Sequence, residues 1–199
     1  MVNGIILASK SQIRSALLLK AGLKFTVADA NIDEKEVKFF YLNEGRSARD
    51  LADILAGMKA KKLSCKYLDK LVIGCDQIME CNGQILSKAN NPNDLSDQLK
   101  ILRNKSHTLY SGCAVYFANK VEWRFIGSVT ITMRNLSDEY ISKYVDENWN
   151  EVKHCIGGYK IENSGIPLLS KINGDYFSIL GLPIIQLIDY LIDRGVLKH

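Results

Sequence analysis

Apolar and polar positions alternate along the chain in a way that predicts several short strands. Short apolar or β-branched runs bounded by polar residues are typical of buried strands. Such runs predict strands at residues 4–8, 25–27, 71–75, 107–117 and 123–133. Asn82-Gly83 predicts a hairpin turn inside 79–86, and 166–170 and 176–180 are also predicted to be extended.

Other segments place apolar residues three or four positions apart, which is the spacing of one helix face. They predict helices at 13–21, 47–62, 95–102, 138–145 and 183–191. Gly22 is a stop signal for the first helix, and Ser137 is the predicted N-cap of the fourth. The polar stretch 31–34 is predicted to be a loop. Strands and helices are mixed along the chain, which predicts an α/β or α+β fold.

Composition and charge narrow the class of protein. The 199 residues are enough for one large domain or for two small lobes that share a core. A formal charge of +4 does not by itself indicate a nucleic-acid-binding protein, and it suits an enzyme that handles phosphates. Five cysteines without C-x-x-C spacing argue against a disulfide framework or a zinc site. With neither a signal peptide nor a membrane span, the sequence predicts a cytoplasmic protein with no membrane partner and no nucleic-acid partner.

The first candidate for chemistry is the turn between the strand at 4–8 and the helix at 13–21. A helix N-terminus has unpaired N–H groups that attract phosphate. Ser9 and Ser11 can add hydroxyl donors, and the guanidinium of Arg14 can bind phosphate oxygens through parallel hydrogen bonds. A serine here could also do no more than cap the helix.

Carboxylates and lysines form a second group of candidates. Asp76 follows the apolar run 71–75, and ligands of open α/β sheets lie beyond the carboxyl ends of the strands. A carboxylate there can bind Mg²⁺ or Mn²⁺ or orient a water molecule, although aspartate is also common in ordinary turns. A second acidic pair stands at 33–34. Lys59 and Lys88 are isolated lysines, which are usually exposed and without function.

Eight segments together give a more specific signal than any residue alone. They are 6–14 (I-L-A-S-K-S-Q-I-R), 32–34 (I-D-E), 55–60 (L-A-G-M-K-A), 72–77 (V-I-G-C-D-Q), 82–88 (N-G-Q-I-L-S-K), 107–112 (H-T-L-Y-S-G), 157–162 (G-G-Y-K-I-E) and 173–183 (N-G-D-Y-F-S-I-L-G-L-P). Their order and wording resemble the Maf family, whose members are nucleotide pyrophosphatases and are also described as septum-formation inhibitors. The resemblance covers nearly the whole chain.

The resemblance implies a fold, a reaction and a cofactor. The implied fold is a single α/β domain over 1–199, with two lobes around a mixed β-sheet and a central cleft, similar to ITP pyrophosphatases. The implied reaction is hydrolysis of a nucleoside triphosphate to the monophosphate and pyrophosphate. A divalent metal (Mg²⁺, Mn²⁺ or Co²⁺) is the implied cofactor, and the habit of the family suggests a homodimer.

The resemblance also assigns roles to residues of this sequence. The residues expected to contact the substrate are Ser9, Ser11, Arg14, Lys59, Gln77 and Glu162. Those expected to act in catalysis are Asp76, Glu34 and Lys88. Glu34 and Asp76 would hold the metal, and Asp76 would also orient the attacking water. Lys59 and Lys88 would neutralise phosphate charge.

The substrate and the activity each have an alternative. Gln77 and Glu162 resemble the branch of the family associated with 7-methyl-GTP, whereas the branch associated with dTTP and UTP usually has threonine and glutamine there. Ser87 and Ala89 replace the usual glycine and proline around Lys88. This departure keeps open a nucleotide-binding regulator of septum formation or cell division that barely hydrolyses. A pyrophosphatase for deaminated purines such as ITP ranks lower, because the segments do not match that family.

Overall fold

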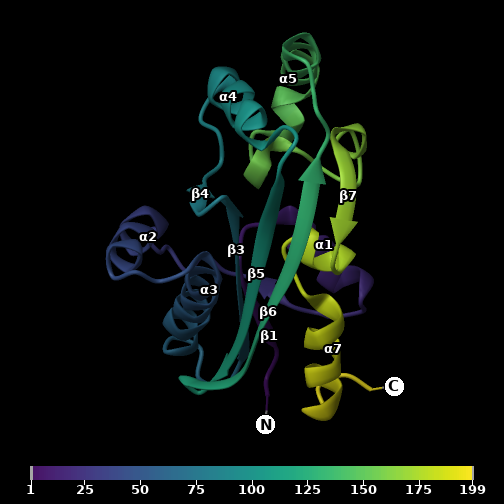
Figure 1. The fold of residues 1–199 in the computed structure, drawn as a ribbon. Coiled ribbons are helices and arrows are strands. Elements are labelled where there is room, and N and C mark those ends of the chain that lie inside the picture. The colour runs from purple at the N-terminus through teal and green to yellow at the C-terminus, as the bar shows by residue number, and fades with distance from the viewer. Residues whose placement is uncertain (1, 199) are drawn as a thin grey trace. The chain divides into compact units, whose positions relative to one another are not determined.

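The computed structural model describes residues 2–198 and contains a seven-stranded mixed sheet. Its strands are β1 (Ile5–Ala8), β2 (Thr26–Val27), β3 (Leu71–Cys81), β4 (Gln84–Leu86), β5 (Ser106–Phe117), β6 (Lys120–Met133) and β7 (Leu169–Asn173). Their order is β2-β1-β3-β5-β6-β7, with β4 paired to β3. β1 runs parallel to β2 and β3, whereas β4 is antiparallel to β3 and β7 is antiparallel to β6. The predicted mixed α/β fold is therefore confirmed (Figure 1).

Helices connect most of these strands. They are α1 (Gln12–Lys20), α2 (Glu34–Asn43), α3 (Ala48–Ser64), α4 (Pro92–Leu102), α5 (Asp138–Val152), α6 (Tyr176–Ile179) and α7 (Ile184–Asp193), with 3-10 helices at Ile156–Gly158 and Ile166–Leu168. None of these helices is long and apolar enough to cross a membrane.

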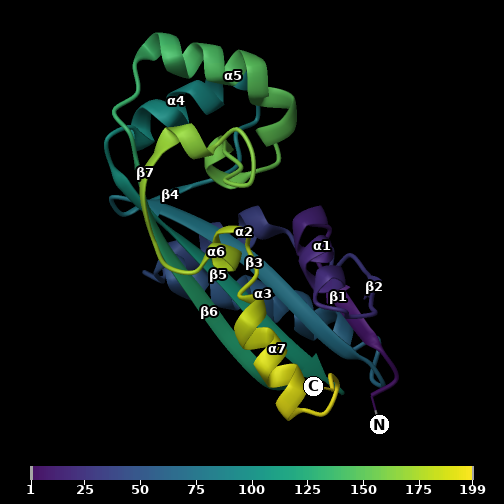
Figure 2. The same cartoon turned by 90° about the vertical axis from the view of Figure 1, so that its right-hand side faces the viewer.

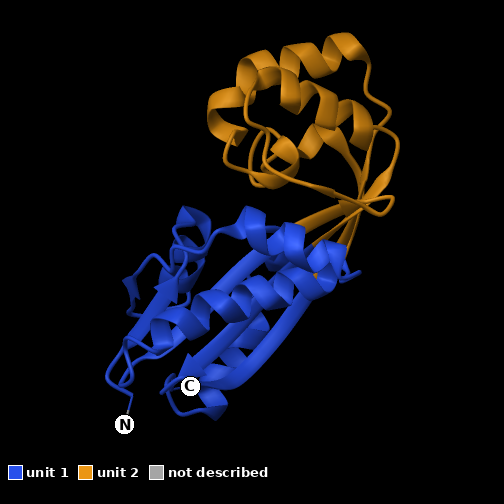
Figure 3. Cartoon of the chain, turned by 90° about the vertical axis from the view of Figure 1, so that its left-hand side faces the viewer, with its two compact units in different colours: residues 1–77, 110–127, 175–199 blue, residues 78–109, 128–174 orange. Residues whose placement is uncertain are grey.

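The chain divides into two compact units (Figure 3). Unit 1 consists of residues 1–77, 110–127 and 175–199, and unit 2 consists of residues 78–109 and 128–174. Strands β3, β5 and β6 each contribute residues to both units. Of the predicted site residues, Lys88 and Glu162 belong to unit 2 and all others belong to unit 1.

In unit 1, alternate residues of β1 and β3 point to opposite faces of the sheet. One face packs against α1 and α7 in a cluster that includes Ile73 and Leu187. The other packs against α3 in a cluster that includes Val72 and Ala60. Figures 1 and 2 show α3 and α7 on opposite sides of these strands. The side chain of each strand residue therefore meets either α3 or the α1 and α7 pair.

Helix α3 approaches the sheet closely because two strand positions are glycine. A Cβ atom at Gly74 would lie 2.2 Å from the carbonyl oxygen of Ala56, and one at Gly112 would lie 2.3 Å from that of Ala52. Packed protein interiors have no room for such contacts with rigid backbone atoms. The two glycines therefore set the spacing between α3 and strands β3 and β5.

Two elements extend further than the sequence pattern predicts. The strand predicted at 71–75 continues to Cys81, because residues such as Ile78 stay fully buried beyond the polar positions. The helix predicted at 138–145 continues to Val152, which is also buried. In both segments, polar residues inside the strand or helix resemble a terminating signal, and the prediction therefore ends too early.

Three other segments fold differently from the prediction. Residues 166–168, predicted to be extended, form a 3-10 helix, and strand β7 begins only at Leu169. The stretch 176–180, predicted to be extended, contains α6, because the Asp175 carboxylate caps this helix and accepts from the Ser178 N–H at 2.8 Å. Residues 34–43 form α2, whereas the pattern predicts no helix there and places Glu34 in a loop. Helix α2 buries none of its residues, and its apolar side chains Phe39, Phe40 and Leu42 are exposed.

Unit 2 contains a buried histidine. Its ring Nε2 lies 2.6 Å from the hydroxyl of Tyr159, and the side chain of His107 is 1% exposed. The Nδ1 atom has no hydrogen-bond partner among residues 2–198. Burial lowers the pKa of His107 to about 4, because the charged ring would lose its hydration. His107 is therefore neutral in the folded protein at neutral pH.

We expect Gly74→Ala to destabilise the protein by about 1–3 kcal/mol, because the added methyl group must push α3 away from β3. The matched control is Gly57→Ala in α3, where the new Cβ meets only the end of the Arg124 side chain, which pairs with Asp53. This control should cost less than Gly74→Ala, because the end of a side chain can shift where a backbone carbonyl cannot, and alanine favours a helix over glycine by up to about 1 kcal/mol. Urea unfolding measures both values, and equal midpoints for the two variants would contradict the role of Gly74.

We expect acid to weaken the fold through His107. Below pH 6.5 the unfolded state takes up a proton that the folded state refuses until about pH 4. The free energy of unfolding should therefore fall as the pH falls through this window, by roughly 1.4 kcal/mol per pH unit. His107→Gln should remove this slope, while His154→Gln, at an exposed position, should keep it. Identical slopes in the wild type and His107→Gln would show that His107 is not the cause.

Candidate active site

Lys59 joins two carboxylates from different elements of unit 1. Its Nζ atom lies 2.5 Å from Oδ1 of Asp76 and 2.5 Å from Oε1 of Glu34. Burial by itself would lower the pKa of Lys59, but the charges of Asp76 and Glu34 and their hydrogen bonds outweigh it, and the net shift is upward from 10.5. Lys59, whose side chain is 12% exposed, is therefore a protonated cation between the two residues predicted to hold a metal.

The Asp76 carboxylate has one oxygen in use and one without a partner. The residue is 5% exposed, and Oδ1 accepts a hydrogen bond from Lys59. Oδ2 is buried and has no hydrogen-bond partner among residues 2–198. A buried carboxylate oxygen without a partner is costly, which indicates a position for a water molecule or a cation.

Asp76 lies within β3 rather than at its end, where the sequence predicts it. The interruption of the sheet near Asp76 arises instead from the neighbouring strand. β1 pairs with β3 as far as Ala8, opposite Gly74, and β3 continues for several residues beyond that point. Sites in such sheets usually lie beyond the carboxyl ends of parallel strands, and here the strand that ends at the site is β1 rather than β3.

Glu34 reaches Lys59 because α3 also holds the turn before α2. Glu34 is the first residue of α2, and Asp33 is its N-cap. The Nζ atom of Lys62 donates to the carbonyl oxygen of Asn31 at 2.7 Å. Two lysines one helical turn apart in α3 therefore fix this turn and the Glu34 carboxylate.

Ser9, Ser11 and Arg14 form a second group in unit 1, at the start of α1. Ser11 is the N-cap, and its Oγ accepts from the N–H of Arg14 at 3.5 Å. Ser9 Oγ accepts from the N–H of Ser11 at 3.3 Å and from Nη1 of Arg14 at 3.1 Å. The Arg14 guanidinium also donates through Nε to Gly181 O at 2.8 Å and through Nη1 to Cys75 O at 3.0 Å. Three of its five N–H groups are thus committed to the protein.

Gln77 lies on the opposite face of β3 from Asp76, because neighbouring strand residues alternate. Its Nε2 lies 3.0 Å from Ser111 Oγ, 3.1 Å from Ser178 O and 3.0 Å from Ile179 O. All three can accept, so the nitrogen faces the protein. Oε1 makes no hydrogen bond among residues 2–198, and a ligand would therefore meet an acceptor.

The groups that hold Gln77 have no predicted role. Ser111 is fully buried and donates to the Ser178 carbonyl oxygen at 2.7 Å. Both serines lie in segments that carry the family resemblance, 107–112 and 173–183. Their place in those segments is the one sequence feature that could have marked them as site residues. The folded chain shows in addition that both contact Gln77.

Lys88 and Glu162 belong to unit 2, and both side chains are exposed. Lys88 follows β4, whose last residue is Leu86. The Ser87 carbonyl oxygen before it accepts from Nε2 of Gln98 at 2.8 Å, so a bond to α4 holds the turn that lacks the usual glycine. Neither Lys88 nor Glu162 forms an ion pair or hydrogen bond with another described residue. Their roles toward a nucleotide stay predictions.

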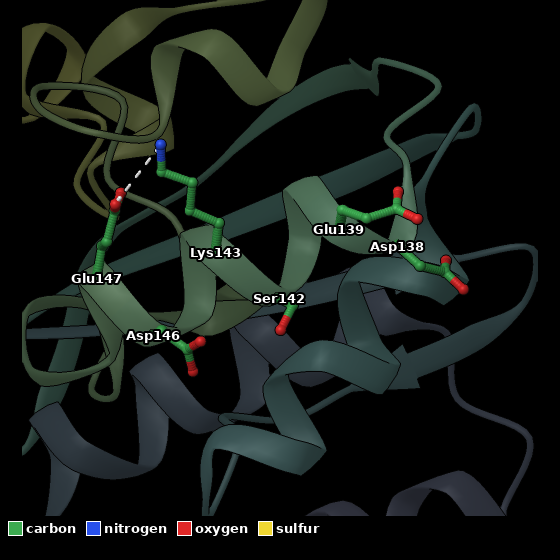
Figure 4. Close-up of a pocket in the computed structure, with 6 residues that line it drawn as sticks. All are labelled: Asp138, Glu139, Ser142, Lys143, Asp146 and Glu147. Atoms are coloured by element: carbon green, nitrogen blue, oxygen red, sulfur yellow. Dashed lines mark ion pairs between the residues drawn. The ribbon is translucent and has the colours of Figure 1, made fainter.

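A shallow hollow of about 660 Å³ lies elsewhere, along one face of α5 (Figure 4). It is lined by Asp138, Glu139, Ser142, Lys143, Asp146 and Glu147. All six come from one helix, and none is a predicted site residue. The hollow therefore plays no part in the candidate site.

Comparisons with known proteins agree with the segments that carry the resemblance. The family model described as Maf-like protein matches residues 4–194. A protein of Roseobacter denitrificans named nucleoside triphosphate pyrophosphatase is 45% identical over all of both chains, and one of the same name from Ruegeria sp. is 42% identical over all of both. A 7-methyl-GTP pyrophosphatase of Bartonella quintana is 36% identical over 99% of this chain and 98% of its own.

The chain therefore belongs to the Maf family. The match covers the site segments of both units, including those around Asp76, Lys88 and Glu162. The prediction of the family from the eight segments is confirmed.

We expect Lys59→Met to destabilise the protein by about 3–5 kcal/mol, because it leaves the buried Asp76 carboxylate without its partner. Glu34→Gln should cost about 1 kcal/mol or less, because the Glu34 side chain is 42% exposed and water screens its charge. Denaturant unfolding at pH 7 measures both. Since the pKa of Lys59 is raised, its contribution should persist below about pH 10.5 and fade as the pH rises further. A larger effect of Glu34→Gln would contradict this order.

Proposed function

We propose that this member of the Maf family is a metal-dependent nucleoside triphosphate pyrophosphatase. It hydrolyses a nucleoside triphosphate to the monophosphate and pyrophosphate, the activity for which its full-length relatives are named. One observation carries the proposed mechanism: the Asp76 carboxylate is buried, held through Oδ1 by Lys59, and has Oδ2 without a described partner.

Asp76 is suited to orient the attacking water. An ionised carboxylate only accepts hydrogen bonds, so Oδ2 can accept one from a water molecule and later take its proton. Lys59 prevents the carboxylate from turning, because it holds Oδ1 at 2.5 Å. A water bound there would be positioned before the reaction, which removes part of the entropic barrier.

The carboxylates of Asp76 and Glu34 also fit a divalent metal. Mg²⁺ is commonly bound by one or two carboxylates together with substrate phosphates, rather than by a cage of protein ligands. Among residues 2–198 no group of three or more His, Cys, Asp or Glu side chains could hold a metal ion, which suits a site shared with the substrate. When bound, Mg²⁺, Mn²⁺ or Co²⁺ would neutralise the charge that develops on the phosphate oxygens.

The start of α1 is the proposed contact for phosphate oxygens. Ser11 caps this helix, and the N–H groups of a helix N-terminus together with the Ser9 and Ser11 hydroxyls can donate to an anion. Arg14 is predicted to share this contact, but only its two Nη2 donors lack partners among the described residues. Lys88 is proposed to neutralise phosphate charge.

The substrate is proposed to be a modified purine nucleotide such as 7-methyl-GTP. Gln77 offers an acceptor through Oε1, which would pair with an N–H donor. Glu162 carries an exposed carboxylate, which would favour a positively charged methylated ring. A relative at 36% identity is named for 7-methyl-GTP, which supports this choice. A dTTP or UTP pyrophosphatase is the alternative.

The proposed setting is the cytoplasm, with the nucleotide as partner, no nucleic acid or membrane, and a homodimer as the assembly. The five cysteines without a disulfide among them support a reducing compartment. The modest formal charge of +4 supports a small anionic substrate rather than a nucleic acid.

We expect pyrophosphate release from one nucleotide in a panel that includes 7-methyl-GTP, dTTP, UTP and ITP, assayed with and without Mg²⁺, Mn²⁺ or Co²⁺. Asp76→Asn should lower the rate by at least about 100-fold, because it removes the group that accepts the proton. The matched control is Asp146→Asn, at an exposed position of α5, which should keep the rate.

Each outcome of this assay decides between the candidates. Release from dTTP and UTP, with 7-methyl-GTP intact, would overturn the proposed substrate and keep the enzyme class. No release from any nucleotide, with folded protein that still binds one, would favour the nucleotide-binding regulator. Full activity in Asp76→Asn would remove Asp76 from the mechanism.

A further inference from the structure

Arg14 lies where the hydrogen bonding of the sheet is interrupted. In a parallel pair of strands, alternate residues direct both their N–H and their C=O toward the same neighbour. The N–H of Leu71 donates to Gly4 O at 3.0 Å, so Leu71 faces β1, and by alternation the carbonyl of Cys75 faces the same side. Because β1 ends at Ala8, the strand is too short to supply a donor for this carbonyl.

The guanidinium of Arg14 takes the place of the missing donor. Nη1 donates to Cys75 O at 3.0 Å and to Ser9 Oγ at 3.1 Å, and Nε donates to Gly181 O at 2.8 Å. These acceptors belong to β3, to the turn after β1 and to the turn after α6. Arg14 is only 9% exposed, so one buried side chain ties three segments together.

The contact with Cys75 bears directly on Asp76. The C=O of Cys75 and the N–H of Asp76 belong to one planar peptide group, so a bond that fixes this plane also fixes the start of the Asp76 side chain. We propose that Arg14 is a positioning residue, which holds Asp76 in place through the Cys75 carbonyl rather than by binding phosphate. This inference rests on the proposed role of Asp76 toward water.

Lysine cannot replace arginine in this position. The guanidinium is a planar fork with donors in fixed directions, whereas the ammonium of lysine is a single point on a flexible stem. The Arg14→Lys variant would keep the positive charge but could not span the carbonyls of Cys75 and Gly181 in the same way. This substitution therefore separates the geometry of the residue from its charge.

The first test measures kcat and KM of Arg14→Lys with the preferred nucleotide. A positioning role predicts that kcat falls by roughly 100-fold, as expected when a reacting group moves by about 1 Å. KM should stay within about threefold, because uniform substrate binding is unchanged. The control is Arg124→Lys, whose arginine pairs with Asp53 outside the site and should keep both constants. A KM raised about tenfold or more with kcat retained would overturn the proposal in favour of phosphate binding.

The second test is hydrogen exchange, which needs no activity. Loss of the Arg14 contact should speed amide exchange in 74–78 by about tenfold or more and leave 113–116 of β5 unchanged. Equal acceleration in both segments, or none in 74–78, would overturn the proposal. A wild type without pyrophosphatase activity would refute the proposed function alone, because the exchange result still tests what Arg14 holds.

A second variant covers the case in which Arg14→Lys does not fold. In Gly181→Ala the added Cβ would lie 3.2 Å from Nε and Nη2 of Arg14, at a backbone φ of +88°. It displaces the guanidinium without removing it. Gly181→Ala should show the same loss of kcat and the same faster amide exchange in 74–78. A folded Gly181→Ala protein in which both kcat and exchange are unchanged would overturn the proposal.

Discussion

The absence of a side chain at Gly74 is the constraint on which the candidate site depends. It lets α3 approach β3 until a Cβ at this position would lie 2.2 Å from a helix carbonyl oxygen. At that spacing Lys59, one turn further along α3, reaches Asp76 two residues further along the strand. Burying a charged pair costs several kcal/mol of desolvation per ion, and the attraction between the charges offsets this cost only when their geometry is close. The 2.5 Å contact between Lys59 and Asp76 therefore depends on the close approach of α3 and β3.

The early end of β1 is the second constraint, and it has two consequences. It leaves the edge of β3 beside Asp76 without a neighbouring strand, where a continuous sheet would have continued the pairing. It also leaves the Cys75 carbonyl without a main-chain donor, and a buried carbonyl needs one. The guanidinium of Arg14 supplies that donor, so the interruption of the sheet also explains why an arginine is buried here.

The sequence pattern predicts the buried elements well and the exposed ones poorly. β1, β5 and α3 are found because their apolar residues follow the period of their structure. Helix α2 is missed although Val37, Phe40 and Tyr41 have helical spacing, because the acidic residues at its start resemble a loop and the helix buries none of its residues. The continuation of β3 is missed because Asp76 is an ionisable residue in the middle of a strand, which is rare enough to resemble the end of one.

The same limit applies to the site. The family segments select Asp76, Glu34 and Lys59 from sequence alone, but they carry no distances. An isolated lysine is usually exposed, whereas the Lys59 side chain is 12% exposed and joins two carboxylates. Arg14 is likewise predicted to bind phosphate, but the sequence does not show that three of its N–H groups also bind Ser9, Cys75 and Gly181.

The charges at Lys59 give a reason why substrate and metal would arrive together. The carboxylates of Asp76 and Glu34 are balanced by the ammonium groups of Lys59 and Lys38, so this point offers no net positive charge to a phosphate. A triphosphate is strongly negative, and the Asp76 carboxylate would repel it where water is excluded. A divalent cation would supply the missing positive charge, and phosphate oxygens would complete its coordination better than two carboxylates alone. Lys59 then keeps Glu34 and Asp76 together before a cation binds, since two bare carboxylates would push each other apart.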